Sequence, residues 1–249
     1  MASFPGIGPQ LLLILVGITA TKRSRSTINR FFDLHSSYRT LVPRLPLRRG
    51  VRASARWLDR YLAQTVRPQE TGPLHVLAYI AGGAVLRYLT AEGRAPELRR
   101  VLYVRGPVQE LVPAAMVRKY GRLIARLLGG RTMIDLADGW PEALPFPVAL
   151  GEQGLIVEDG VSSLAHALGL DARNPSAASW DPARLLPGAS AVLRVPESHD
   201  EVYSSPALMH AAIHFFDEGR FGAGRVSAHA CSGAVLLAAN HAVPNEHAR

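Results

Sequence analysis

Five short apolar runs, each set between stretches that can form helices, constrain the fold of this chain more than any other feature. They occupy residues 10–17, 74–80, 100–105, 154–158 and 190–195. Short, continuously apolar runs are typical of strands that are buried on both faces, as in a parallel sheet. Their alternation with helices predicts one α/β domain with a doubly wound, mainly parallel sheet.

The segments between these runs include four predicted helices. Residues 51–66 carry apolar side chains at a spacing of three and four, which is the pattern of an amphipathic helix. Residues 81–89 follow the second strand almost without a linker, and residues 112–128 are rich in helix-forming types. Residues 206–219 begin with Pro and end with Gly, as helices often do.

The two ends of the chain lack such periodicity. We expect the stretch from the first strand to about Arg48 to be irregular, and residues 222–249 to form a polar C-terminal extension to a domain of residues 1–221. The apolar residues 11–16 are too few to cross a bilayer, so no transmembrane helix is expected. The single cysteine, Cys231, excludes an internal disulfide and is interpreted as a structural thiol.

Positive charge is concentrated near the N-terminus. The net charge is +8, and residues 20–58 hold ten basic side chains against one acid, Asp33. Such a block attracts an anionic partner, which can be an acidic protein surface, RNA or anionic lipid; the alternative is a solvated face. The candidate interface within the basic surface segment 20–60 consists of Lys22, Arg23, Arg25, Arg30, Arg49, Arg52, Arg56 and Arg60.

The composition of the N-terminal segment also bears on location. The first 32 residues contain no acid and several Arg and Ser, which mitochondrial import tolerates. A mitochondrial location is the expectation, and a bacterial cytoplasm is the alternative.

The second strand and the helix after it have the arrangement of a nucleophile elbow. That motif, G-x-S-x-G, needs small residues on both sides of a strained turn between strand and helix. Residues 78–83 read AYIAGG, with small residues at both ends. The position of the nucleophile holds Ile80.

This stretch resembles the Gly-His-Ser-Met-Gly-Gly elbow of lipase-like α/β-hydrolases. Residues 101–109 (VLYVRGPVQ) are similar to the strand and Pro-Asn-Gln turn that follow in bacterial-type lipases and esterases. Residues 154–158 resemble the strand that ends near the acid loop, and residues 193–199 resemble the segment that bears the catalytic histidine, here His199. Residues 209–221 resemble the closing helix. The resemblance covers about residues 10–221 and implies an α/β-hydrolase fold.

This chain departs from the family pattern at residues that the family uses for hydrolysis. The family needs a hydroxyl at the elbow, a histidine that takes its proton and an acid that orients the histidine. Ile80 has no nucleophilic atom. Family acid loops carry Asp-Gly about nine residues before an Arg-Leu pair, and counting back from Arg184 reaches Pro175, with Asp171 and Asp181 as nearby substitutes.

We therefore expect a pseudoenzyme in which Ile80, Ala81 and His199 are vestigial positions. The Ala81 amide can occupy an oxyanion-hole position, but no attacking group precedes it. The turn that is commonly Gly-Ser in the family is Glu110-Leu111 here. We expect no cofactor. We also expect no metal site, because the pair His210 and His214 lacks a third ligand.

Three hypotheses for function remain open. The first is a structural or accessory subunit of a larger, mitochondrial assembly that uses protein contacts, with lipid or RNA as further partners of the basic segment. The second is a lipase- or esterase-like hydrolase with a non-standard nucleophile. The third is a small-molecule or lipid-binding protein that uses the old hydrolase pocket.

Overall fold

A mainly parallel β-sheet forms the centre of the structure. The computed structural model describes residues 10–66, 73–104, 111–158, 160, 162–169, 186, 188–199, 201–222 and 236–237. In this part of the chain seven strands pair in the order β2-β1-β3-β4-β5-β6-β7, and all are parallel except β7. The strands are β1 (Leu11–Leu15), β2 (Arg39–Leu41), β3 (Leu74–Tyr79), β4 (Leu98–Val104), β5 (Gln153–Glu158), β6 (Ala191–Val195) and β7 (Leu236–Leu237). The predicted doubly wound sheet is confirmed.

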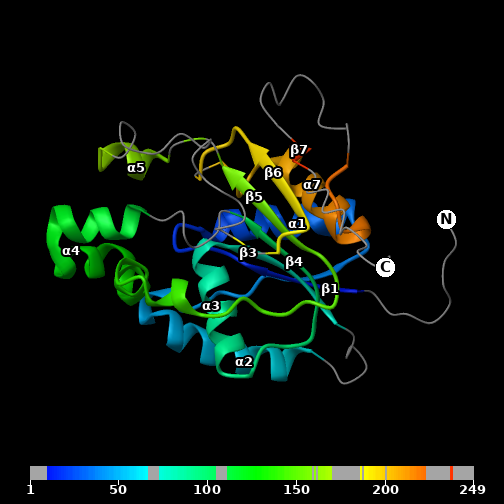
Figure 1. The fold of residues 1–249 in the computed structure, drawn as a ribbon, viewed down its shortest axis with the longest axis horizontal. Coiled ribbons are helices and arrows are strands. Elements are labelled where there is room, and N and C mark those ends of the chain that lie inside the picture. Colours follow the sequence, from blue (N-terminus) through cyan, green and yellow to red (C-terminus); the bar gives the residue numbers. More distant parts are fainter. Residues whose placement is uncertain are drawn as a thin grey trace, which may run out of the picture.

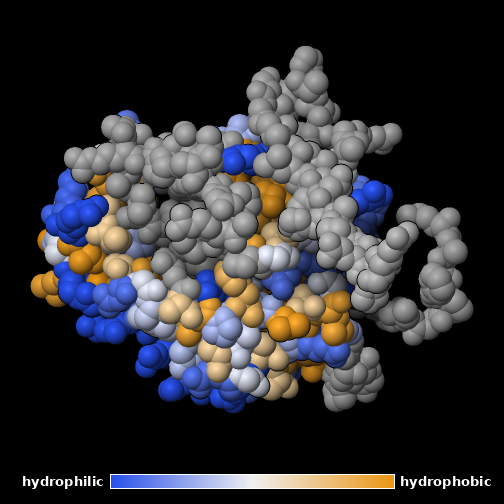
Figure 2. All heavy atoms as spheres, in the orientation of Figure 1, coloured by the Kyte–Doolittle hydropathy of each residue, from blue (hydrophilic) through white to orange (hydrophobic). Residues whose placement is uncertain are grey.

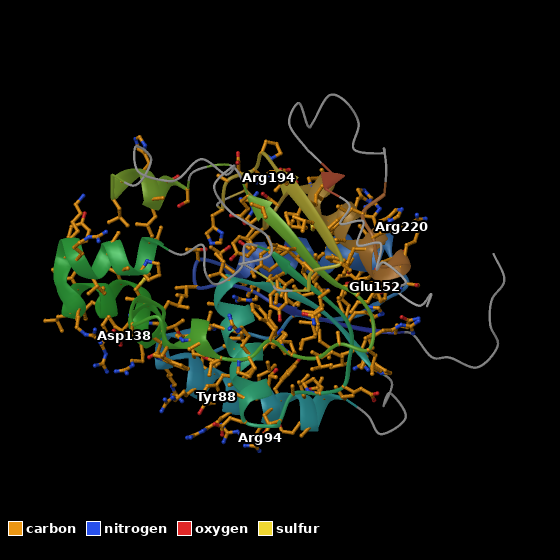
Figure 3. All side chains as sticks on the ribbon, viewed as in Figure 1. Tyr88, Arg94, Asp138, Glu152, Arg194 and Arg220 are labelled. Atoms are coloured by element: carbon orange, nitrogen blue, oxygen red, sulfur yellow. The ribbon has the colours of Figure 1, made fainter. Side chains whose placement is uncertain are left out.

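Helices cover both faces of this sheet (Figure 1). One face carries α2 (Val51–Thr65) and α3 (Ile80–Ala91), and the other carries α1 (Lys22–His35) and α7 (Pro206–Glu218). The other helical elements in the described residues are η1 (Leu47–Arg49), α4 (Leu111–Ala137), η4 (Trp140–Ala143) and α5 (Ser163–Ala167). Side chains from the sheet and from both helical layers fill the space between them (Figure 3).

Strand β1 shows how one apolar run serves two cores. All five of its residues are buried. Because successive side chains of a strand point to opposite faces, Leu11, Leu13 and Leu15 pack on the side of α2 and α3. Leu12 and Ile14 join the core beneath α1 and α7. A strand between two helical layers has no solvent-facing side, which explains why the run is apolar throughout.

The stretch expected to be irregular contains helix α1, so that prediction was wrong. Thr21 caps the helix: its hydroxyl accepts a hydrogen bond from the amide of Ser24 at 3.0 Å. Only two side chains of the helix, Ile28 and Phe32, are fully buried. Ile28, Phe31 and Phe32 have helical spacing and pack on the core, but this short apolar signal within a basic stretch was overlooked.

Helix α4 is longer than the predicted residues 112–128, and it is kinked. Gly121 and Gly130 have positive φ angles of 80° and 74° inside it. Glycine adopts this conformation at little steric cost, so the two positions divide α4 into three helical pieces. Together with α5, it projects beyond the edge of the sheet (Figure 1). Among the described residues, no helix is long and apolar enough to span a membrane.

The segment predicted as a polar extension contains one strand. Leu236 and Leu237 form β7, which pairs antiparallel with Leu193 and Val192 of β6. The predicted helix 206–219 is present as α7, with Pro206 in its first turn and Gly219 in the left-handed conformation at its end.

Close contact between α3 and β1 generates a first prediction. A Cβ at Gly82 would overlap the carbonyl oxygen and the Cβ of Leu15, whereas a Cβ at Gly83 would meet the ring of Tyr103 at 3.3 Å. We expect Gly82→Ala to lower the free energy of unfolding by about 1–3 kcal/mol, because backbone must move to relieve the overlap. Gly83→Ala is the matched control with a smaller loss, since a ring can shift. Chemical denaturation of both variants checks this, and equal losses would contradict it.

His75 on β3 generates a second prediction. Its Nε2 lies 2.8 Å from Oε1 of Gln10, and its Nδ1 is buried without a hydrogen-bond partner in the described structure. Burial, with Arg99 and Arg100 nearby, lowers the pKa of His75 from 6.5 to about 4. The unfolded chain takes up this proton below pH 6.5 but the folded chain does not, so stability falls as the pH drops from 6.5 to about 4.

The loss over this interval is about 3 kcal/mol, the free energy that corresponds to the pKa difference. Urea denaturation at a series of pH values measures it. His75→Gln cannot titrate, and we expect its unfolding free energy to lose this part of the pH dependence. Parallel pH profiles for the wild type and the variant would refute the assignment.

Candidate functional site

The junction of β3 and α3 occupies the position of a nucleophile elbow. Tyr79 ends the strand in an extended conformation, and Ile80 is the first residue of the helix. The small residues at positions 81–83 allow α3 to pass close to β1 and β4, as the near-overlap at Gly82 indicates. The strand–turn–helix arrangement expected from the sequence is therefore present, with a buried isoleucine at its apex.

Ile80 lies in the lining of a narrow, mainly apolar cavity. Its volume is about 60 Å³. Sites for small-molecule ligands usually enclose roughly 300–1,000 Å³. The lining comes from the loop after β1, the start of α3, both ends of α4 and the segments after β5 and β6: Gly17, Ile18, Thr19, Ile80, Ala81, Val112, Pro113, Met133, Leu136, Ser162, Leu164 and His199.

His199 and Glu158 approach each other at one side of this cavity. Nδ1 of His199 lies 3.5 Å from Oε2 of Glu158. The side chain of Glu158 is fully buried, and that of His199 is 12% exposed. Glu158 ends β5 and His199 follows β6; because these neighbouring strands are parallel, their carboxyl ends meet at the same edge of the sheet. The structure thus gives the histidine an acidic neighbour.

The sequence had placed the acid loop elsewhere. Counting back from Arg184 led to Pro175, which lies outside the described residues, as do Asp171 and Asp181. Glu158 was missed because it was taken as the end of an apolar strand. Two signals could have found this region: a carboxylate at the end of a fully buried run, and the Asp-Gly pair of residues 159–160 directly after it. Asp159 itself is outside the described residues.

Two tyrosines, Tyr79 and Tyr203, pack near the histidine. The ring of Tyr203 lies 5.7 Å from that of His199 and 4.7 Å from that of Tyr79. The amide of Gly17 donates a hydrogen bond to the Tyr203 hydroxyl at 3.2 Å. Burial raises the pKa of Tyr79 far above 10, and Tyr203 and Glu158 add to this effect, so the phenol stays neutral. Tyr79 is therefore an uncharged packing group in the core beside Tyr203.

The backbone at the expected oxyanion-hole position is the start of a helix. The amide of Ala81 belongs to the first turn of α3, where helix amides have no partner within the helix. Such amides stabilise an oxyanion only if a nucleophile creates one, and Ile80 cannot. Of the altered turn, Glu110 lies outside the described residues and Leu111 begins α4.

The Ser162 hydroxyl in the cavity lining forms a hydrogen bond with a helix backbone amide. Ser162 caps α5, and its Oγ accepts a hydrogen bond from the amide of Ala165 at 3.1 Å. Within the described chain, no hydroxyl or thiol forms a hydrogen bond to His199.

The structure does not bring the predicted basic interface together. Lys22, Arg23, Arg25 and Arg30 lie on α1, against one face of the sheet. Arg49 lies in η1, and Arg52, Arg56 and Arg60 lie on α2, against the opposite face. Arg52, Arg56 and Arg60 of α2 are exposed, but they form a surface separate from that of α1.

The outer side of α2 combines charge with aromatic rings. Trp57 and Tyr61 stack at 5.2 Å with 12° between their planes, and both are partly buried. The guanidinium of Arg52 lies 5.1 Å from the centre of the Trp140 ring. Arg56 and Arg60 have no acidic partner among the described residues.

His210 and His214 have separate surroundings although they share α7. The ring of His210 packs 4.8 Å from Phe31, while Nδ1 of His214 lies 3.0 Å from the carbonyl oxygen of Arg220. The described residues contain no group of three His, Cys, Asp or Glu side chains that could hold a metal ion. Cys231 lies outside them.

Comparison with known proteins identifies the architecture. In sequence, the chain matches no family model and no curated protein. In structure, it is similar to MGS-MChE2, an alpha/beta hydrolase enzyme from a metagenome of lagoon sediments at Mar Chica, Morocco. The TM-score is 0.53 at 16% sequence identity, and the match covers 85% of this chain and 92% of that one. The mature lipase BlEst2 of Bacillus licheniformis gives a TM-score of 0.53 at 13% identity, covering 87% and 94%.

A variant of the pyrethroid hydrolase PytH gives a TM-score of 0.50 at 17% identity, covering 85% of this chain and 98% of its own. These proteins are hydrolases, and at such low identity the likeness concerns the fold. The strand order, the elbow between β3 and α3, and the edge where Glu158 meets His199 agree with it. This chain has the α/β-hydrolase fold.

Proposed function

We propose that this protein is a non-catalytic member of its fold class that acts as a structural or accessory subunit of a larger assembly through protein–protein contacts. The observation that carries the proposal is the side chain at the elbow. Ile80 stands at the start of α3 and lines the cavity that also contains His199. A hydrocarbon side chain at this position can neither attack a carbonyl group nor pass a proton to the histidine.

The cavity supports the same proposal. At about 60 Å³ it has room for little more than water, and Ile80, Val112 and Leu136 make its lining apolar. The small volume also argues against the ligand-binding hypothesis, because a small-molecule site would need a larger, open pocket above the elbow.

The outer surface of α2 supports a role in protein contacts. Tryptophan, tyrosine and arginine are enriched where proteins meet, because they combine a large contact area with hydrogen-bonding capacity. Trp57 and Tyr61 form a stacked pair on this surface, with Arg56 and Arg60 on the same helix. We place the assembly in the mitochondrion, on the basis of the basic, acid-free N-terminal composition.

Sedimentation tests the accessory role. In a gently solubilised mitochondrial extract, we expect the protein to migrate far above its own mass of 26.9 kDa. The double variant Arg56→Glu, Arg60→Glu should move to the position of the free protein, because acidic groups would replace the basic ones on the α2 surface. Arg23→Glu with Arg30→Glu on α1 is the matched control for charge and should stay with the assembly. A wild-type protein that sediments at 26.9 kDa overturns the proposal.

One observation favours a hydrolase as the second candidate. The His199–Glu158 pair persists at 3.5 Å, and Ser162 lines the same cavity. An unusual enzyme would need His199 to activate either a water molecule or this serine.

Ester hydrolysis separates the two candidates. We expect the purified wild type, His199→Ala and Ser162→Ala to hydrolyse a short-chain p-nitrophenyl ester at rates equal to within about twofold, because general base catalysis contributes 10²–10⁴-fold only where a nucleophile is present. A rate that falls a hundredfold or more in His199→Ala would establish the hydrolase instead. A parallel fall in Ser162→Ala would identify its nucleophile.

A further inference from the structure

The middle piece of α4, between its two glycine kinks, carries an exposed apolar ridge. We define this ridge as four aliphatic side chains, which are exposed as follows: Leu123 72%, Ile124 45%, Leu127 63% and Leu128 60%. At about 100° per residue, they span an arc of roughly 140° on one side of the helix. Four large aliphatic side chains together on a projecting element differ from the scattered apolar residues that protein surfaces normally show.

The ridge is held in this orientation by contacts on the other side of the helix. Ala125 is fully buried. Arg48 donates a hydrogen bond from Nη2 to the carbonyl oxygen of Leu127 at 2.8 Å. Arg122 forms two hydrogen bonds with Asp138, at 2.6 and 2.9 Å; Asp138 is labelled close to α4 in Figure 3. The aliphatic side chains therefore point outward because the opposite side of the helix is anchored.

Positive charge borders the ridge. Residues 111–134 contain five basic residues (Arg118, Lys119, Arg122, Arg126 and Arg131), of which Arg122 pairs with Asp138 and Arg131 with Asp135. Arg118 and Arg126 are exposed and have no acidic partner within the described chain. Lys119 donates to the carbonyl oxygen of Ala167 at 3.0 Å, which leaves its charge unbalanced. Figure 2 shows apolar and strongly hydrophilic side chains next to each other on this projection, at the left of the view.

We propose that the middle piece of α4 is a contact site for the surface of an anionic phospholipid bilayer. Aliphatic side chains on one side of a helix, with Arg and Lys beside them, are the features of a helix that lies in the plane of the membrane interface. The ridge enters the boundary between headgroups and acyl chains, and Arg118 and Arg126 contact lipid phosphates. The anionic-lipid contact expected at residues 20–60 is thus assigned to another segment.

Charge argues against a second copy of this chain as the occupant. In a symmetric dimer through the ridge, the basic side chains of one copy would face those of the other. Like charges brought together at an interface oppose association, and the nearby acids Asp135 and Asp138 already pair with Arg131 and Arg122 of the same copy. An anionic bilayer supplies both the apolar phase and the negative charge that this surface lacks.

Vesicle flotation with the full-length protein tests the proposal. We expect the wild type to float with vesicles of phosphatidylcholine and phosphatidylserine. Leu123→Ser with Leu127→Ser should reduce this partitioning about tenfold or more, because two buried aliphatic side chains are lost. Arg118→Gln with Arg126→Gln should reduce it roughly tenfold on the mixed vesicles and leave the weak binding to pure phosphatidylcholine unchanged.

Matched controls distinguish a site from general attraction. Leu34 on α1 is 67% exposed, so Leu34→Ser is the control for loss of an exposed leucine, and Arg56→Gln with Arg60→Gln is the control for loss of charge. Both should bind as the wild type does, and thermal unfolding should show that every variant is folded. The proposal is overturned if the wild type stays with the soluble fraction, or if the controls lose as much binding as the α4 variants.

A further outcome would also overturn it. If the wild type dimerises in sedimentation equilibrium and the Leu123→Ser, Leu127→Ser variant does not, the ridge is an interface between copies. The proposal is independent of the accessory-subunit role, which is tested on α2. If the wild type sediments with the assembly but does not float with vesicles, the lipid contact has failed. If it floats but sediments as the free protein, the accessory role has failed.

Discussion

The near-contact of α3 with β1 is the constraint on which the rest of the site depends. Gly82 has no Cβ, so the backbone of α3 can pass directly over the carbonyl group of Leu15. Only at this separation can the helix begin at Ile80, immediately after β3, and share one cavity with the loop that follows β1. The turn is a property of small residues and not of a nucleophile. The elbow therefore has a packing role that does not depend on any chemistry at position 80.

The same reasoning applies to His199 and Glu158. A carboxylate buried at the end of a central strand is unfavourable unless a polar or charged group approaches it. Breaking a buried pair of this kind commonly costs several kcal/mol, about 3–5 where the pair is ionic. The pair thus has a structural reason to persist whether or not the protein performs catalysis. Its presence is weaker evidence for an enzyme than the absence of a hydroxyl at Ile80 is against one.

The predictable features of this structure were those that follow from local pattern and burial. Strands β1, β3, β4, β5 and β6 are apolar because helices cover both sides of the sheet, and α2 and α7 follow from periodicity and from the Pro and Gly at the ends of α7. Helix α1 was missed because its apolar signal is limited to Ile28, Phe31 and Phe32 within a basic stretch. Glu158 was missed because its partner, His199, follows a different strand about 40 residues later. Counting residues back along the loop does not reveal that β5 pairs with β6, which brings the two side chains together.

Charge was the least informative feature until the fold was known. The basic segment appeared continuous along the chain, yet the sheet separates α1 from α2 and places their arginines on opposite faces. The surfaces of α2 and α4 then differ in chemistry although both carry arginine. Rigid stacked rings, such as Trp57 and Tyr61, suit a partner of fixed shape, because little side-chain freedom is lost on contact. The flexible leucines of the α4 ridge suit a fluid phase that requires no shape match, so the two surfaces favour two different partners.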